Sequence, residues 1–258
     1  FSMVKDKEFY RSLFIVALPA AFQGLISMGV NMLDNVMVGS LGDVTLASVS
    51  LANQATNLFT FIVNGIGGGA AVLISQYWGK QDYVRIRRIF GVILRFAAVV
   101  SLVVCALAAL FPEQVMRIFT SDADMIREGA KYVRIVCFSY PLFAISNTMV
   151  VMLRWMEIVR IGLIVSSISL VCNFCFNYLL IFGKFGFPAL GARGAAIATV
   201  IARAVELCVA AYYLFVREKR VRFRLRDFFT HDREMSEDFF RHALPVIAGD
   251  SQWGLVGT

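Results

Sequence analysis

The chain has 258 residues, of which 59% are hydrophobic, and it combines a formal net charge of +7 with a mean hydropathy of +0.70. A soluble domain of this size could not bury so much apolar surface, so the composition excludes a soluble globular protein and predicts a membrane protein. The apolar runs are continuous, which excludes a transmembrane β-barrel with its alternating strands. The predicted fold class is therefore all-α and polytopic.

Six segments are long enough to cross a hydrocarbon core as helices, which takes about 20 residues. Four of them contain no charged side chain, one contains Arg95, and one contains Arg203 and Glu206. Arg203 and Glu206 are three positions apart on one helix face, so a structural ion pair is the favoured interpretation. In chain order the predicted spans are 12–33, 44–79, 89–111, 135–153, 161–183 and 194–216.

The basic residues predict the orientation of these spans, because short loops rich in Lys and Arg stay on the cytoplasmic side. The N-terminal arm and every second loop after it carry seventeen Lys and Arg, against six in the opposite loops. We therefore expect a multi-pass protein of the cytoplasmic (inner) membrane with its N-terminus inside. The basic run 217–226 is expected to touch anionic headgroups rather than nucleic acid.

An internal repeat predicts the domain organisation. FIVALP (14–19) recurs as FRHALP (240–245), and each copy opens an apolar segment after a basic arm. The repeat indicates a parent of about twice this length, in which two six-helix lobes start from the same side, as in many secondary transporters. Within the chain we expect a six-helix lobe (1–216), a cytoplasmic connecting loop (217–241) and the start of helix seven (242–258).

The stretch NMLDNVMVG (31–39) places Asp34 in an otherwise uncharged apolar region. A carboxylate there must be paired, protonated or exposed to a water-filled cavity. Asp34 and Asn177 each precede the outer end of their own span by about the same number of residues, so the two side chains can meet. Asn173 lies on the same helix face as Asn177. Such a group can exchange a proton or hold a sodium ion, and no other metal site is expected. A helix-capping role for Asp34 remains open.

The second span contains amide side chains that are candidates for a cavity wall. Three of them follow the spacing of one helix face, and a polar stripe on a membrane helix points away from lipid. The stripe is expected either to line a cavity or to hydrogen-bond a neighbouring helix. The candidates are Asn53, Gln54, Asn57 and Asn64.

Two prolines and one further acidic residue complete the candidates. Pro19 removes an intrahelical hydrogen bond and is expected to act as a hinge below Asp34, and Pro141 is expected to disturb the fourth span. Asp250 follows Pro245 by five residues near the start of helix seven. It is expected to belong to a second site.

Several stretches together carry a family likeness. They are ALP (17–19), DNVMVGSLG (34–42), GIGGGAAVLISQYWGKQD (65–82), NFCFNYLLIFGKFGFPALGARGAAIATVIAR (173–203), and a second ALP followed by an acidic residue and Trp253. In these stretches the chain resembles the multidrug and toxic compound extrusion (MATE) family of cation-coupled efflux transporters.

The resemblance implies twelve helices in two lobes that exchange H⁺ or Na⁺ for an organic, often cationic, substrate. It implies no further cofactor, and we expect a monomer. Asp34 matches the family's first-helix carboxylate, Asn173 its fifth-helix asparagine and Asp250 the acidic position of helix seven. Asn177 departs from members that have Asp there, which leaves the coupling ion open.

Two other functions remain open. A lipid-linked oligosaccharide flippase of the same superfamily would share this architecture but carry a more cationic cavity, whereas the spans here contain only Arg95 and Arg203. An intramembrane enzyme would need a motif such as HExxH, or a Ser/His or paired-Asp constellation, and these residues show none. The sequence therefore predicts a transporter of small organic molecules in membrane lipid, not an enzyme.

Overall fold

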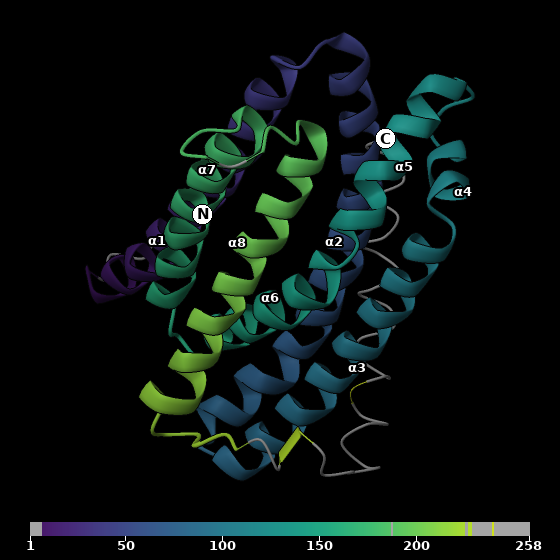
Figure 1. Cartoon of the computed structure of the whole chain (residues 1–258). Coiled ribbons are helices and arrows are strands. Elements are labelled where there is room, and N and C mark those ends of the chain that lie inside the picture. Colours follow the sequence, from purple (N-terminus) through teal and green to yellow (C-terminus); the bar gives the residue numbers. More distant parts are fainter. Residues whose placement is uncertain (1–6, 187, 225–226, 229–238, 240–258) are drawn as a thin grey trace, which may run out of the picture.

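The computed structural model describes residues 7–186, 188–224, 227–228 and 239, and the regular elements in them are helices (Figure 1). They are α1 (Lys7–Gly39), α2 (Asp43–Gly79), α3 (Tyr83–Leu110), α4 (Pro112–Arg117), α5 (Ala123–Val136), α6 (Ser139–Trp155), α7 (Arg160–Phe182), α8 (Ala192–Tyr212) and a short π-helical turn, η1 (Tyr213–Arg217). The predicted all-α class is confirmed.

The predicted spans fall on these helices. α2, α3, α7 and α8 with η1 are each long and apolar enough to cross a membrane, and α5 with α6 forms a fifth candidate when the bent pair is taken together. The first predicted span lies within α1, a continuous helix of 33 residues. At 1.5 Å per residue α1 is about 50 Å long, which exceeds the thickness of a hydrocarbon core.

The fourth predicted span, 135–153, is bent, as expected from Pro141: α5 and α6 meet at an angle of 52°. Pro141 explains the position of the break. Its ring excludes the carbonyl of the residue four positions earlier, Cys137, and α5 ends there. The Cys137 carbonyl instead accepts a bond from the Tyr140 amide at 3.0 Å. Pro141 then lies in the first turn of α6, where its missing N–H leaves no bond unmade.

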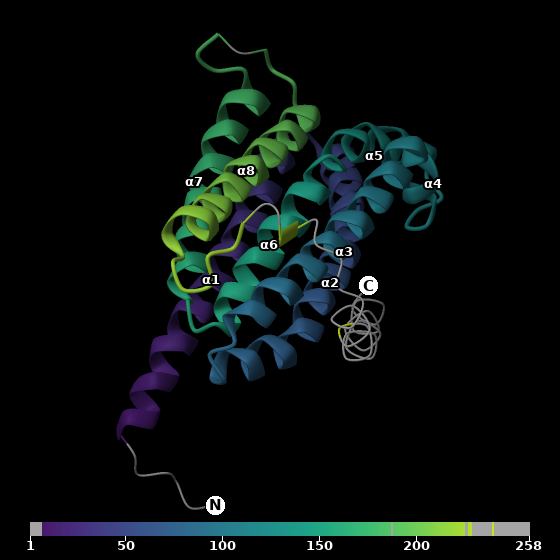
Figure 2. The same ribbon diagram turned by 90° about the horizontal axis from the view of Figure 1, so that it is seen from below.

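Figures 1 and 2 show how the helices are arranged. α7 and α8 run side by side, α1 lies against α7, and α6 crosses between α8 and the α2/α3 pair. Two apolar clusters hold the lobe together. One joins α2, α3, α6 and the end of α8, and the other joins α2, α5 and the start of α8 near the opposite end of the bundle. The space between these clusters is where a polar site can form.

Small residues allow α7 and α8 to approach closely, as is common between membrane helices. Buried alanines line the inward face of α8. Gly194 in its first turn faces the backbone of Leu180 in α7, and a Cβ atom at Gly194 would lie 2.5 Å from the Leu180 carbonyl oxygen. No side chain fits at this position without a backbone shift.

We therefore expect Gly194→Val to lower the free energy of unfolding by about 1–3 kcal/mol, because overpacking forces the two backbones apart. Gly29→Ala in α1 is the matched control, since a Cβ there meets nothing within 4 Å. Thermal unfolding of the purified protein in detergent measures both. Equal melting temperatures for the two variants would contradict the close approach.

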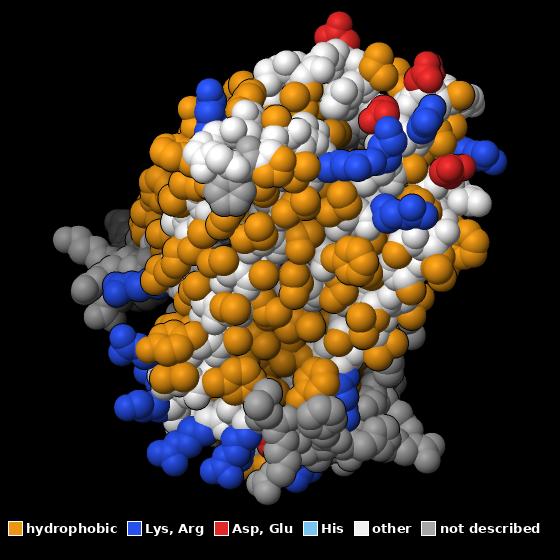
Figure 3. All heavy atoms as spheres, in the orientation of Figure 1, with side chains coloured by type: hydrophobic (Ala, Val, Ile, Leu, Met, Phe, Trp, Pro, Cys, Tyr) orange, Lys and Arg blue, Asp and Glu red, His pale blue; other side chains and the backbone are white. Residues whose placement is uncertain are grey.

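Basic side chains gather at one end of the bundle, which we call the basic end (Figure 3). The α2–α3 and α6–α7 turns and the segment after η1 lie there (Figure 1), whereas the opposite end carries acidic and basic side chains together. The start of the predicted connecting loop packs against this end. Phe223 is buried with its ring centroid 5.2 Å from that of Phe90 in α3, and the Arg220 guanidinium lies over the Trp78 ring. Most of 225–258 lies outside the described residues.

We expect the basic end to face the cytoplasm. Cysteine introduced at the exposed position Arg222, in a background without the five natural cysteines, should react with an impermeant maleimide in inverted vesicles and not in right-side-out vesicles. Lys184→Cys in the exposed α7–α8 loop is the control and should show the reverse pattern. Labelling of position 222 from outside would show that the orientation is wrong.

Candidate functional site

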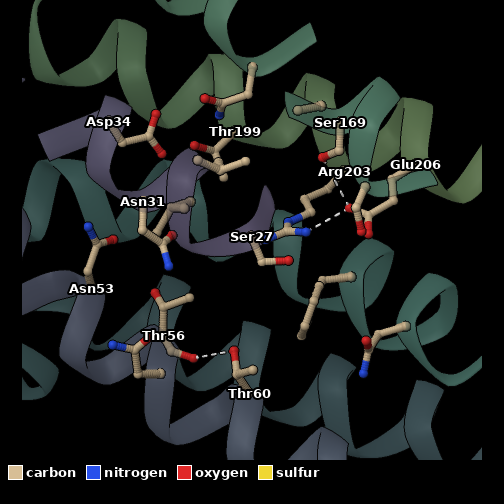
Figure 4. A pocket seen from close by; sticks show the side chains of 18 of the residues that line it. Ser27, Asn31, Asp34, Asn53, Thr56, Thr60, Ser169, Thr199, Arg203 and Glu206 are labelled. Atoms are coloured by element: carbon tan, nitrogen blue, oxygen red, sulfur yellow. Dashed lines mark hydrogen bonds and ion pairs between the residues drawn. The ribbon is translucent and has the colours of Figure 1, made fainter. Parts of the chain in front are cut away.

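A cavity of about 450 Å³ opens between α1, α2, α5, α6, α7 and α8, and neutral polar side chains make up most of its wall (Figure 4). Such a wall is unusual in a chain that is 59% hydrophobic. In hydrocarbon each polar group needs a partner, so polar side chains turn inward toward one another and toward water. Among the described lining residues the charged ones are Asp34, Arg203 and Glu206.

α1 supplies one wall through a stripe of polar residues that our sequence analysis missed, apart from Asp34. Their spacing of four, four, and three or four positions keeps them on one helix face. Apolar side chains such as Phe22, Leu25 and Met32 are exposed on other faces of the same helix, as expected toward lipid. The spacing of three or four positions between polar residues was the sequence signal that could have identified this stripe. The stripe consists of Gln23, Ser27, Asn31, Asp34 and Asn35.

α2 supplies the facing wall, and three of the four predicted residues line it: Asn53, Asn57 and Asn64. Gln54 does not line the cavity. It follows Asn53 by one position, which rotates its side chain by about 100° away from that face. The prediction for Gln54 was therefore wrong.

The two interpretations left open for this polar stripe both hold. Asn64 lines the cavity and also accepts a 3.0 Å hydrogen bond from Asn147 of α6. Asn53 accepts a longer one, 3.5 Å, from the Tyr132 hydroxyl of α5. Thr56, one turn from Asn53, shares a 3.2 Å hydrogen bond with the Tyr140 hydroxyl. These bonds fix the polar face of α2 against α5 and α6.

Asp34 and Asn177 meet, a contact that their equal depth allowed. The Asn177 amide nitrogen donates to an Asp34 carboxylate oxygen and, at 3.0 Å, to the Asn173 side-chain oxygen. Both asparagines are buried, whereas Asp34 is half-buried and lines the cavity. α1 continues to Gly39, so Asp34 does not cap a helix end. Within the described residues the buried side-chain oxygen of Asn177 has no hydrogen-bond partner.

Arg203 and Glu206 form the predicted ion pair, with 2.7 Å between Nη1 and Oε2. The pair also lines the cavity, which its interpretation as a structural pair did not predict. Ser169 of α7 lies 3.5 Å from the same carboxylate oxygen. The Arg203 guanidinium lies over the Phe143 ring of α6, 4.6 Å from its centroid. The pair therefore joins α6, α7 and α8.

A further polar contact crosses the cavity wall toward the basic end. Arg154, in the last turn of α6, donates a 2.5 Å hydrogen bond to the Gln23 side-chain oxygen of α1. Gly162 of α7 leaves the room for it, because a Cβ there would lie 2.5 Å from that oxygen. Pro19 lies one turn before Gln23 inside α1, and its role as a hinge remains a prediction. Asp250 lies outside the described residues.

Fold and site together define a polytopic helical membrane protein with a polar intramembrane cavity and a carboxylate in its wall. The MatE family profile matches residues 19–179, more than half of the chain. The chain therefore belongs to this family, and the resemblance seen in its sequence motifs is confirmed.

Individual relatives agree with this assignment. The chain is 29% identical over 220 residues to the "Probable multidrug resistance protein NorM" of Thermotoga maritima, covering 85% of this chain and 47% of the relative. It is 25% identical over 253 residues to the "Multidrug resistance protein NorM" of Vibrio cholerae, covering 95% and 54%. The chain thus spans about half the length of the curated relatives that it matches.

Solved structures show the same fold. A structure described as "Outward-facing conformation of a multidrug resistance MATE family transporter of the MOP superfamily" superposes with a TM-score of 0.81 at 21% identity, covering 93% of this chain and 52% of the other. A second, "Crystal structure of MATE in complex with MaD3S", gives a TM-score of 0.82 at 20% identity, covering 93% and 53%. At this identity the likeness is one of fold.

Proposed function

We propose that the chain forms one lobe of a cation-coupled antiporter that exports organic, mainly cationic, molecules across the cytoplasmic membrane. The contact between Asp34 and Asn177 at the cavity wall carries this proposal. Asp34 lines the cavity, so an ion and a substrate inside it would both come within reach of this carboxylate, and among the described lining residues the other charged groups are the mutually paired Arg203 and Glu206.

The unpaired oxygen of Asn177 supports a site for H⁺ or Na⁺. A proton on the Asp34 carboxylate turns one of its oxygens into a hydrogen-bond donor. The Asn177 side-chain oxygen can accept that hydrogen bond after the amide group rotates. A sodium ion instead takes oxygen ligands, and Asp34, Asn173 and Asn177 present side-chain oxygens close together. Either ion would satisfy the oxygen and neutralise the carboxylate, so binding would change the charge of the cavity by one unit.

The charge of the cavity supports export of cations. Asp34 and Glu206 outnumber Arg203 among the lining residues, so the wall carries one excess negative charge when both carboxylates are ionised. Arg95 bonds to the Gly91 carbonyl of its own helix and does not line the cavity. This arrangement supports a cationic substrate over the flippase alternative, for which we expect a more cationic cavity.

The names of the relatives support drug export. Relatives such as the Vibrio cholerae protein are called multidrug resistance proteins, and this chain covers about half of each. We propose that a second lobe of similar size completes the cavity and that the two lobes alternate between outward and inward states. Aromatic and aliphatic groups on the substrate would then contact side chains such as Phe143 and Val30.

The complete transporter should lower the accumulation of lipophilic cationic dyes in cells, because an ion gradient drives their exit. Fluorescence of dye-loaded cells measures this efflux. Ionophores that collapse both the proton and sodium gradients should stop it, while ATP depletion with the gradients clamped should not. Efflux that persists without either gradient would exclude secondary coupling.

Asp34→Asn should leave the protein folded and inserted but reduce gradient-driven efflux to background, because the amide cannot take up a proton or balance a cation. Asn177→Ala should weaken efflux by removing the recorded partner of Asp34. Asp43→Asn is the matched control, since Asp43 lies exposed in the first turn of α2 outside the cavity, and efflux should be unchanged. Normal efflux by a well-expressed Asp34→Asn protein would reject the coupling role.

A further inference from the structure

We propose that residues 218–224 form a strap folded across the basic end of the lobe, and that its outward arginines bind the phosphate groups of anionic phospholipids. The strap belongs to the predicted connecting loop and lies outside the cavity. The inference is independent of the export function, because it concerns neither the coupling ion nor the exported molecule. It goes beyond the headgroup contact predicted from the sequence, because the fold holds the arginines in a fixed array.

The strap is anchored to the lobe by two apolar side chains. Val221 and Phe223 are 1% and 4% exposed, and both belong to the apolar cluster that joins α2, α3, α6 and the end of α8. The Phe223 ring lies 5.2 Å from the Phe90 ring of α3, centroid to centroid. Gly91, the next residue of α3, makes room for the chain after the strap, because a Cβ there would clash with the Asp227 carbonyl oxygen. The segment after η1 thus crosses the end of the bundle from α8 to α3 (Figures 1 and 2).

The anchors decide which side chains of the strap face outward. Arg220, Arg222 and Arg224 are exposed, and they alternate along the chain with the two buried anchors. The Arg222 side chain donates a 3.2 Å bond from Nε to the Lys219 carbonyl, and the Arg224 amide donates a 2.8 Å bond to the Asp227 carboxylate. These bonds limit the conformations of the segment, so the three guanidinium groups form one array on the surface of the basic end.

Ion pairs within the described residues do not balance the positive charge of this array. The strap carries Lys219 and the three arginines against one acid, Glu218. Glu218 is buried and accepts a 2.8 Å bond from the Arg220 amide. The ion pairs formed by the described residues include no residue of the strap. An array of like charges without counter-ions attracts anions from its surroundings.

Aromatic side chains place the array at the depth of the lipid headgroups. Trp155 is the last residue of α6 and Tyr212 the last of α8, and they are 40% and 58% exposed at the basic end. Trp and Tyr on the surface of membrane proteins are enriched at the level of the headgroups. Trp78 lies at the same end of the bundle, in the last turn of α2, and the Arg220 guanidinium lies 5.7 Å from its ring centroid. The array is therefore level with the phosphate groups of the leaflet.

The chemistry of arginine selects phosphate among the anions at this depth. A guanidinium group forms two parallel, charge-assisted hydrogen bonds with a phosphate group. The cytoplasmic leaflet, which the basic end is predicted to face, carries anionic phospholipids. An anionic phospholipid is therefore the partner that fits both the charge and the depth of the strap.

The alternative is that the basic residues act only through their number, as in any positively charged cytoplasmic loop. Binding would then depend on net charge and not on how the strap is docked. If the anchors position the arginines, a change that undocks the strap weakens lipid binding although every charge is kept. Variants of these two kinds therefore separate a binding site from diffuse attraction.

The experiment uses the complete transporter in detergent micelles and measures binding of fluorescently labelled phosphatidylglycerol. Phosphatidylcholine with the same acyl chains and label is the neutral control lipid. The array variant combines Arg220→Gln, Arg222→Gln and Arg224→Gln. Its matched control removes three exposed charges at the opposite end, with Arg117→Gln, Arg127→Gln and Lys184→Gln. We expect wild type to bind phosphatidylglycerol about tenfold or more tightly than phosphatidylcholine, the array variant to lose about tenfold, and the control to stay within about twofold.

Docking is tested by variants that keep every charge. Phe223→Ala removes an anchor, and Gly91→Ala pushes on the chain after the strap. Each should weaken phosphatidylglycerol binding about threefold or more, because the arginines lose their fixed positions and must be ordered again on binding. Gly79→Ala, also at the basic end, is the matched control, since a Cβ there meets nothing within 4 Å, and it should bind like wild type.

Each other outcome overturns a stated part of the inference. Equal binding of the two lipids by wild type, or equal losses in the array variant and its control, rejects the lipid site. Unchanged binding by either docking variant rejects the fixed array, and if Phe223→Ala does not fold, Gly91→Ala decides. Displacement of phosphatidylglycerol by inorganic phosphate or an RNA oligonucleotide at equal concentration overturns the choice of a lipid. None of these outcomes affects the export function, which efflux measures separately.

Discussion

The hydrogen bond between Asp34 and Asn177 shows the constraint on which this lobe depends: inside a bilayer a polar group must find its partner within the protein. The carboxylate and its two amide neighbours sit on helices that are far apart in sequence, so the bond fixes α1 against α7. The same constraint turns the polar faces of α2 and α8 inward. A cavity with a polar wall is the result, and apolar side chains are left to face lipid on the outside of α1.

Packing around the cavity follows from this separation of polar side chains, which face inward, from apolar side chains, which face lipid or neighbouring helices. The two apolar clusters lie toward opposite ends of the bundle, and the alanines of α8 let α7 come close enough for Ser169 to reach Glu206. Bonds from the α2 stripe to Tyr132 and Tyr140 hold its polar face against α5 and α6. The scaffold thus supports a site in which, among the described residues, the side-chain oxygen of Asn177 has no hydrogen-bond partner.

The two charged sites of the cavity are Asp34 and the Arg203–Glu206 ion pair, and they differ in how their charge is neutralised. The hydrogen bond recorded for Asp34 within the described residues comes from the neutral amide of Asn177, which suits a group that gains and loses a proton or a cation. Glu206 has a permanent cation beside it and is buried, which suits a group that holds its partner in place. The Gln23–Arg154 hydrogen bond lies beyond both charged sites, toward the basic end. There, one turn after Pro19, α1 contacts α6 and α7.

The sequence by itself determined the features that depend on position along a helix. Uninterrupted apolar runs predicted the all-α fold, and equal distance from a span's end showed that Asp34 can meet Asn177, because the rise per residue is fixed. The spacing of 53, 57 and 64 likewise predicted one face of α2. Rotation about the helix axis and contact between helices were decided only by tertiary packing. Packing turned Gln54 away from the cavity and placed the Arg203–Glu206 pair in its wall, since each depends on which neighbouring helix fills the adjacent space.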